Sequence, residues 1–436
     1  MFDPTTNNFL NILFIFLKLS WWFWLFLILL PLFKSTYLHW RQEVFQNGKA
    51  FEMVMLELKI PREIKQNPKA MEQILIAMHS LRNAPGNFQE KWLNGEVTIW
   101  YSLEIVSFGG SIRFFIRCPR ARKHLIESAF FSYYPDLELV EVDDYADDLP
   151  KNLVDLEERG LNLFGTEMIL TKEDAYPIKT YKDFESPDEN KEYDPISTFL
   201  EVLGKCRKEE IVGIQFLIAP ADPKWNEKYN KLVEELKERK NKGNSKSSGE
   251  NQAQSTVSFI RTPGETDVLK AVEENLSKPA FHTLIRYIYL SPRELFDSNY
   301  AGKGISGIFN QYTSLNLNSF RQNGAISTRA TIWNKPYIFP KKRVIYKKAA
   351  ILYDYIKRNM PPETFMGKLI TSHFFRWNFD SKTFLLTTTC LATLFHPPTS
   401  AVLIAPHIER IQSKKAGPPP NISIFGEEKE IEKFYE

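Results

Sequence analysis

Cysteine is scarce in this chain of 436 residues, which has three of them. Cys118, Cys206 and Cys390 are odd in number and lie far apart, so they supply neither a disulfide framework nor a CxxC pair for a metal. This pattern is typical of a protein in a reducing compartment.

Catalytic signatures are lacking as well. The sequence has no HExxH and no GxSxG motif, which excludes the zincin and α/β-hydrolase types of active site. Gly367-Lys368 is followed by Leu369 and lacks the upstream glycine of a phosphate-binding Walker A loop. We therefore predict that the chain is not an enzyme, has no catalytic or metal-binding residues, needs no cofactor and does not hydrolyse ATP by itself.

Neither sign of charge dominates. The chain has 56 basic and 53 acidic residues and a net charge of +3, which by itself does not indicate a nucleic-acid-binding protein. The charge is distributed in patches. Residues 141–148 and 183–194 are acidic, whereas residues 341–358 are basic.

One long apolar run is present, at residues 9–33, FLNILFIFLKLSWWFWLFLILLPLF. A helix of this length crosses a hydrocarbon layer of about 30 Å, so we predict a transmembrane anchor. Lys18 is the single charge in the run. The residues that we assign to the membrane are Phe9, Trp21, Trp22, Trp24 and Phe33.

The apolar run admits other interpretations. A buried core helix would need a second apolar partner of this length, and none follows in the sequence. A cleaved signal peptide requires a basic segment before the run and small residues after it, and both are missing. The tryptophans lie in the middle of the run, which leaves open an in-plane or hairpin insertion broken at residues 18–20. Lys34, Arg41 and Lys49 follow the run and no basic residue precedes it, which predicts a single-pass protein of the cytoplasmic membrane with its bulk in the cytoplasm.

The order strand, helix, strand, strand, helix, strand follows a connector at residues 34–49. Alternation with a period of two predicts strands, and apolar spacing of three and four predicts helices. The predicted elements are a strand at 51–60, a helix from Pro68, strands at 97–105 and 112–116 around Gly109-Gly110, a helix at 120–132 and a strand at 138–142. This is the split order of ferredoxin-like domains.

The same order recurs farther along. The predicted elements are strands at 166–170, 212–218, 281–290 and 328–339, and helices from 195, at 224–240, from a capping box at 262–265, and at 306–320. Residues 241–256 are rich in Ser, Gly, Asn and Gln, which predicts a disordered loop.

We therefore expect an α+β fold with a transmembrane helix, two ferredoxin-like modules and a tail. The expected divisions are a terminal segment 1–8, the anchor 9–33, the connector 34–49, modules at 50–150 and 151–340, a helical extension 341–400, and a Pro- and Lys-rich linker with an acidic end at 401–436.

Three groups of residues are candidates for binding or catalysis. Gly302, Gly304 and Gly307 spell GxGxxG, but they do not directly follow a strand and lack the acidic residue that binds ribose, so turn formation at a helix start is favoured over a dinucleotide site. Cys390 with His396 or His407 would offer a thiol and imidazole pair, which is the basis of an alternative function as a membrane-associated enzyme.

The third group of residues forms a basic helix near residues 344–359. Its cations are candidates for contact with a partner or with phosphate, on nucleic acid or on lipid, although a solvated charged face is the simpler interpretation. The residues concerned are Lys347, Lys348, Lys357 and Arg358, with Lys414 and Lys415 in the tail. The basic helix together with Trp333 and Trp377 gives a second alternative, a module that binds single-stranded nucleic acid.

Several short runs resemble one family. They are residues 69–73, 103–107 with Gly110 and 113–116, 133–135 leading to 141–145, 281–283 with 285–286, 391–397, and 408–411 with 413–419. Together they look like the membrane-anchored N-terminal region that precedes the ATP-binding domain in bacterial type IV secretion and conjugative-transfer ATPases. The run at 386–390 departs from that family, which has an Asn-x-Glu-Glu-like sequence there.

The resemblance implies a scaffold without its own motor. The family's catalytic residues belong to the motor domain, and this sequence stops at Glu436 before any such domain, so no catalytic residue carries over. The implied function is a non-enzymatic anchoring module of a DNA- or protein-transfer system that docks a separate P-loop ATPase at the cytoplasmic membrane face. The expected partners are the lipid bilayer, that ATPase and other copies of the chain.

Overall fold

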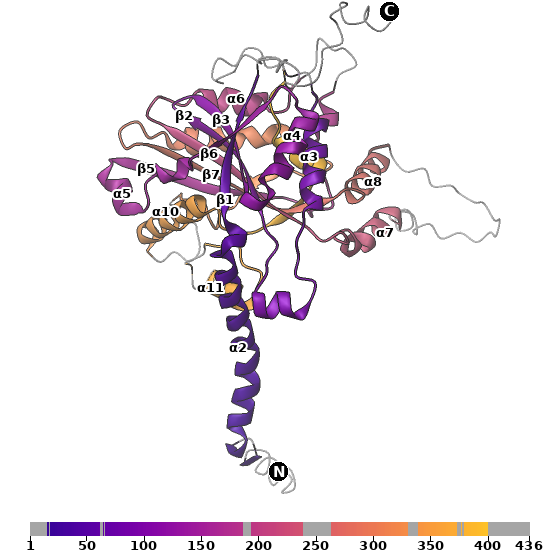
Figure 1. The fold of residues 1–436 in the computed structure, drawn as a ribbon, viewed down its shortest axis with the longest axis vertical. Coiled ribbons are helices and arrows are strands. Elements are labelled where there is room, and N and C mark those ends of the chain that lie inside the picture. Colours follow the sequence, from indigo (N-terminus) through magenta and orange to yellow (C-terminus); the bar gives the residue numbers. More distant parts are fainter. Residues whose placement is uncertain are drawn as a thin grey trace, which may run out of the picture.

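The computed structural model describes residues 15–399, apart from 17, 62–63, 65, 186–192, 239–262, 330–338, 373–375 and 377–378. It is an α+β fold in which a single antiparallel sheet carries helices on both faces (Figure 1). The strand order is β4-β1-β3-β2-β6-β7-β5-β8, with β9 paired to β7.

The first four strands occupy one half of the sheet in the order β4-β1-β3-β2. Their bounds are β1 Met53–Lys59, β2 Tyr101–Phe108, β3 Ser111–Pro119 and β4 Glu138–Val142. The β2–β3 hairpin turns at Gly109 and Gly110, whose φ angles are 57° and 91°. Glycine adopts these left-handed angles without steric cost, so the predicted turn is confirmed.

The other half of the sheet has the order β6-β7-β5-β8. Its strands are β5 Leu161–Leu170, β6 Ile211–Pro220, β7 Ala280–Pro292, β8 Phe320–Gln322 and β9 Phe384–Thr387. The two halves join where β2 pairs with β6, from Tyr101 opposite Ile218 to Phe108 opposite Ile211. One continuous sheet therefore runs through both of the segments expected as modules.

The helices divide between the two faces. The longer described helices are α2 Trp21–Gln46, α3 Lys69–Ser80, α4 Lys123–Tyr133, α5 Leu153–Glu158, α6 Ser197–Gly204, α7 Asn230–Glu238, α8 Pro263–Leu276, α10 Pro340–Lys357, α11 Phe365–Ile370 and α12 Thr388–Leu394. The larger core lies between the sheet and α3, α4, α6 and α12. On the opposite face α5 and α10 pack over a second core.

Two predicted elements of the second half are wrong in extent. The expected helix at 306–320 ends with a 3-10 turn at Ile308–Tyr312, and Phe320 instead begins β8. The fully buried side chain of Asn318 donates to the carbonyls of Glu173 and Tyr176 and thereby draws this segment out of a helix. Thr328, expected in the last strand, lies outside any strand, and 330–338 are outside the described residues.

The remaining predictions differ mainly at element ends. The helix expected at 224–240 is described as a 3-10 turn at Glu227–Tyr229 followed by α7. Helix α8 begins at Pro263 as predicted, but Thr262 of its capping box and the loop 241–256 lie outside the described residues. The tail from residue 400 onward also lies outside them.

Candidate functional site

The N-terminal helix α2 extends away from the body of the protein (Figure 1). It is long and apolar enough to cross a membrane. Trp21, Trp22 and Phe33 have 62%, 63% and 75% of their surfaces exposed, which places them away from any core. Trp24 lies in the same helix, and Phe9 is outside the described residues.

The C-terminal half of α2 is seated against the body. A 3.3 Å contact joins His39 Nδ1 to Thr364 Oγ1. The Ser35 hydroxyl accepts from the backbone N–H of Met366 at 2.7 Å, just inside the start of α11. On the other side Arg41 donates to the carbonyl of Leu93, in the short helix Gln89–Asn94 that we call η2. These contacts fix the direction in which α2 leaves the body.

A row of polar side chains crosses the middle of the sheet. Glu104 of β2 lies opposite Gln215 of β6, Gln215 lies opposite Arg286 of β7, and Arg286 lies opposite Glu167 of β5. Each has at most 1% of its surface exposed. Strand residues directly opposite one another point to the same face, so these four side chains form a continuous buried line across the junction of the two halves.

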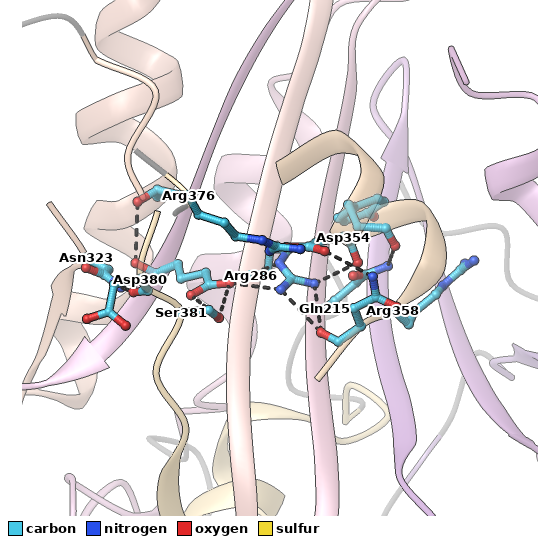
Figure 2. A network of polar contacts seen from close by, with 12 residues as sticks. Gln215, Arg286, Asn323, Asp354, Arg358, Arg376, Asp380 and Ser381 are labelled. Atoms are coloured by element: carbon cyan, nitrogen blue, oxygen red, sulfur yellow. Dashed lines mark hydrogen bonds and ion pairs between the residues drawn. The ribbon is translucent and has the colours of Figure 1, made fainter. Parts of the chain in front are cut away.

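The row holds the C-terminal end of α10. Arg286 Nη1 donates to the carbonyl of Asp354 at 2.8 Å, and Gln215 Nε2 donates to the carbonyl of Tyr355 at 3.1 Å (Figure 2). The last carbonyls of a helix have no partner within the helix, and a cation there also offsets the helix dipole. Side chains of β6 and β7 thus complete the hydrogen bonding of α10.

Arg358 connects this helix end to the first half of the sheet. Its guanidinium lies 3.0 Å from Glu104 Oε1 and 2.7 and 2.8 Å from the two oxygens of Asp144. Burial raises the pKa of Glu104, but the charge and hydrogen bonds of Arg358 outweigh it and hold that pKa below its ordinary value. Ser102 and Tyr145 also donate to this carboxylate, which is therefore ionised and fully bonded.

At the other end of the row, the buried carboxylate of Glu167 is less strongly stabilised by its partners. Glu167 accepts from Arg286 at 2.9 Å and from the Ser381 hydroxyl at 2.8 Å. Burial raises the pKa of Glu167, and the opposing effect of Arg286 does not restore it to its ordinary value. The charge of the nearby Asp354 carboxylate adds to the increase in the pKa of Glu167.

Two glycines allow α10 to lie close to the sheet. A Cβ at Gly213 would be 1.8 Å from Tyr355 Oη, and one at Gly165 would be 2.8 Å from Ile351 Cδ1. Both separations are too short for a real side chain. The glycines therefore set the distance between helix and sheet, and the polar row sets the position of the helix along it.

The cations predicted on the basic helix do not share one exposed face. Arg358 is buried as described, and Lys347 has 3% of its surface exposed, with burial lowering its pKa to about 8. Lys348 donates to Asn162 Oδ1, whereas Lys357 is exposed. The amphipathic spacing of α10 was correctly identified, but the side chains nearest the sheet find partners inside the protein. Lys414, Lys415, Trp333 and Trp377 are outside the described residues.

The expected pair of Cys390 and His396 is not formed. Both are buried, and His396 Nε2 lies 2.8 Å from Asp194 Oδ1 while Nδ1 lies 2.7 Å from the carbonyl of Ala392. Both ring nitrogens are therefore occupied. Burial raises the pKa of the Cys390 thiol, which makes it a poor nucleophile. His407 lies outside the described residues.

The GxGxxG segment serves packing. It forms a π-helical turn at Tyr300–Gly304 that continues into a short helix at Ile305–Gly307. A Cβ at Gly302 would meet the Arg329 guanidinium at 1.4 Å, so Gly302 is needed to admit that side chain. In the parts of the chain that the structure describes, no group of three or more His, Cys, Asp and Glu residues is placed to hold a metal ion.

Sequence reasoning missed the polar row, although a signal existed. Glu104, Gln215, Arg286 and Glu167 each interrupt an otherwise apolar stretch in the middle of a strand. A charged residue in a buried strand requires a partner, but the sequence does not specify which strands become neighbours. The sequence therefore indicated each of these polar residues singly, but it did not indicate that they pair with one another.

Comparison with known proteins gives one assignment. No curated protein matches the sequence. A family model described as "Domain of unknown function (DUF8128)" matches residues 39–329, which include strands β1 to β8 and all four residues of the polar row. The match covers more than half of the chain, and the chain therefore belongs to the DUF8128 family.

Proposed function

We propose that this chain is a non-enzymatic, membrane-anchored assembly module whose body sits at the cytoplasmic face of the membrane. The observation that carries the proposal is the division of α2 into two parts. Before Lys34 its exposed side chains include Trp21, Trp22 and Phe33, and from Lys34 onward it is seated on the body. An exposed apolar segment joined rigidly to a folded body is what a membrane anchor requires.

The buried polar row supports a structural role for the body. A charge buried away from water is tolerated when it is paired, and here the pairs link β2, β5, β6 and β7 to the end of α10. Their hydrogen bonds go to each other and to the backbone of α10. These side chains act as internal connectors of one rigid unit, which suits a docking platform.

The body is proposed to be two ferredoxin-like modules fused edge to edge. The orders β4-β1-β3-β2 and β8-β5-β7-β6 are the same order of fourth, first, third and second strand, and they support this interpretation. The partner is proposed to be a separate P-loop ATPase of a type IV secretion or conjugation-like system. That part depends on the sequence runs that resemble the anchor region of such ATPases.

Membrane fractionation tests the anchor. The full chain with a C-terminal tag is expected to remain at its full size in membranes washed with alkaline carbonate. Leu19→Lys combined with Phe23→Lys, at two exposed positions near the middle of residues 9–33, should release it, because a charge at the centre of a bilayer costs about 3 kcal/mol per residue. Leu125→Lys, at an exposed site on α4, is the matched control and should stay in the membrane. A wild-type chain found wholly in the soluble fraction would refute the anchor.

Purification in detergent tests the partner. The tagged chain is expected to bring down a protein that binds ATP and contains a P-loop, identified by mass spectrometry. Salt washes separate a specific complex from charge-driven background. A chain that is quantitatively alone at low salt would remove the ATPase from the proposal and leave the anchor standing.

A further inference from the structure

Two short helices flank α2 where it meets the body. They are η2, in the loop between α3 and β2, and α11, which follows α10 in the chain; Figure 1 shows α11 against α2. We call residues 88–94 and 364–370 the collar. Lys34 Nζ lies 4.7 Å above the ring of Trp92 in one part of the collar, and Ser35 bonds the other part.

The collar exposes large apolar side chains. Phe88, Leu93, Phe365 and Ile370 have 72%, 52%, 62% and 49% of their surfaces exposed. Clusters of exposed apolar groups mark interaction surfaces. They come from segments far apart in the sequence that the fold brings to the same helix.

Hydrogen bonds fix the turns that carry these exposed side chains. Glu90 accepts from the backbone N–H of Gly86 at 2.7 Å, and Thr364 accepts from the N–H of Gly367 at 3.1 Å. Gly95 ends η2 with a φ of 70°, and a Cβ there would lie 2.4 Å from the backbone of Arg41 in α2. The fold thus holds the collar tightly against α2 with its apolar side chains outward.

The position of the collar along α2 indicates which environment surrounds it. The apolar run ends at Phe33, and the next residue, Lys34, contacts Trp92 of the collar. If residues 9–33 span the hydrocarbon layer, the collar lies where hydrocarbon meets headgroups. Tryptophan and lysine are enriched at that level.

The charges of the collar fit the same surface. Lys91 and Lys368 are exposed beside the apolar side chains, and Lys34 and Arg41 lie on the adjoining part of α2. Glu363 is also exposed. Basic residues near the level of lipid phosphates are attracted to anionic lipids.

We propose that the collar is a second membrane contact, in which Phe88, Leu93, Phe365 and Ile370 enter the boundary between headgroups and acyl chains while Lys91 and Lys368 face lipid phosphates. This inference rests on the proposed membrane anchor and extends it. A single helix leaves a body free to tilt and swivel. Contacts on two sides of that helix fix which face of the sheet-bearing body is presented to the cytoplasm.

The test measures depth in the bilayer site by site. The full chain is labelled with an environment-sensitive fluorophore at Phe88→Cys or Phe365→Cys and reconstituted in vesicles of phosphatidylcholine and phosphatidylglycerol. Native cysteines are buried and are left in place. Lipids carrying a quencher near the headgroup or deep in the acyl chain are then compared. Phe26→Cys in α2 reports the anchor, and Leu125→Cys on α4, at the other end of the body in Figure 1, is the control in water.

The expected pattern distinguishes the two proposals. Labels at 88 and 365 should be quenched several-fold more by the shallow quencher than the label at 125, and the label at 26 should respond to the deep quencher. Unquenched labels at 88 and 365 with a quenched label at 26 would overturn the collar and keep the anchor. An unquenched label at 26 would overturn both. Lipid-insensitive labels whose emission shifts with protein concentration would show that a second copy covers the collar, and would also overturn the lipid assignment.

Discussion

Replacement of Arg358 by methionine is expected to destabilise the protein by about 3–5 kcal/mol, the cost of removing one partner from a buried ion pair. Methionine keeps much of the side-chain length but leaves the carboxylate of Glu104 without its cation. Ser102 and Tyr145 still donate to Glu104, whose exposure is 0%. Asp144 loses the same partner but is 29% exposed, so water compensates it and most of the cost arises at Glu104.

The sign of the pH dependence follows from the same contacts. Arg358 holds the pKa of Glu104 below its ordinary value, so the stability contributed by this carboxylate is present above that ordinary value and is lost as the pH falls through the lowered one. In Arg358→Met only burial remains strongly effective, which raises the pKa of Glu104. The deficit of the variant should therefore shrink as the pH falls, because a protonated Glu104 needs no cation.

The assay is urea unfolding of the full chain in detergent, followed by circular dichroism. Lys357→Met is the matched control, since Lys357 is the exposed neighbour of Arg358, and it should change stability by less than about 0.5 kcal/mol. Adding Glu104→Gln to Arg358→Met should recover part of the loss, with a coupling of about 1–3 kcal/mol. An Arg358→Met variant as stable as wild type, or a double variant with purely additive losses, would refute the account of the buried pair.

Other variants probe separate parts of the fold. Gly213→Ala should destabilise the protein by about 1–3 kcal/mol in urea unfolding, because its Cβ would collide with the hydroxyl of Tyr355. Gly264→Ala is the control and should be nearly neutral, because nothing lies within 4 Å of its Cβ position. Equal effects of the two substitutions would argue against the close approach of α10 to the sheet. The pKa of Asp194 is lowered from 3.8 to about 2, because the ion pair with His396 and the hydrogen bonds of Asp194 outweigh the effect of burial. About 2 kcal/mol of stability should therefore be lost as the pH falls from about 4 to 2. Asp194→Asn should abolish this dependence of stability on pH. Cys390 should react with iodoacetamide many-fold more slowly in the folded chain than in urea, and Cys390→Ala should leave membrane association unchanged; rapid labelling of the native thiol would contradict its burial.

The sequence predicted local structure well where one physical signal dominated. Alternation with a period of two located β1, β3 and β6, and a glycine pair located the β2–β3 turn, because each signal depends on neighbouring residues only. The helix expected at 306–320 was wrong because a long-range contact decided it. The buried amide of Asn318 binds carbonyls of a loop that precedes it by more than 140 residues, and local propensity does not reveal such a contact.

For the candidate sites too, the sequence predicted what depends on neighbouring residues, and tertiary structure decided what depends on distant ones. Length and apolarity alone predicted a membrane-spanning segment at residues 9–33, since that property sums over one continuous stretch. The described helix that is long and apolar enough is α2, Trp21–Gln46, which overlaps the prediction at residues 21–33. Tertiary structure decided which of the basic side chains of α10 are exposed, and it turned Arg358 toward a carboxylate on a strand 254 residues away. It also brought η2 and α11 to the same helix. Pairing of distant charges and exposure of distant apolar groups depend on which segments become neighbours, and the sequence sets this only through the complete fold.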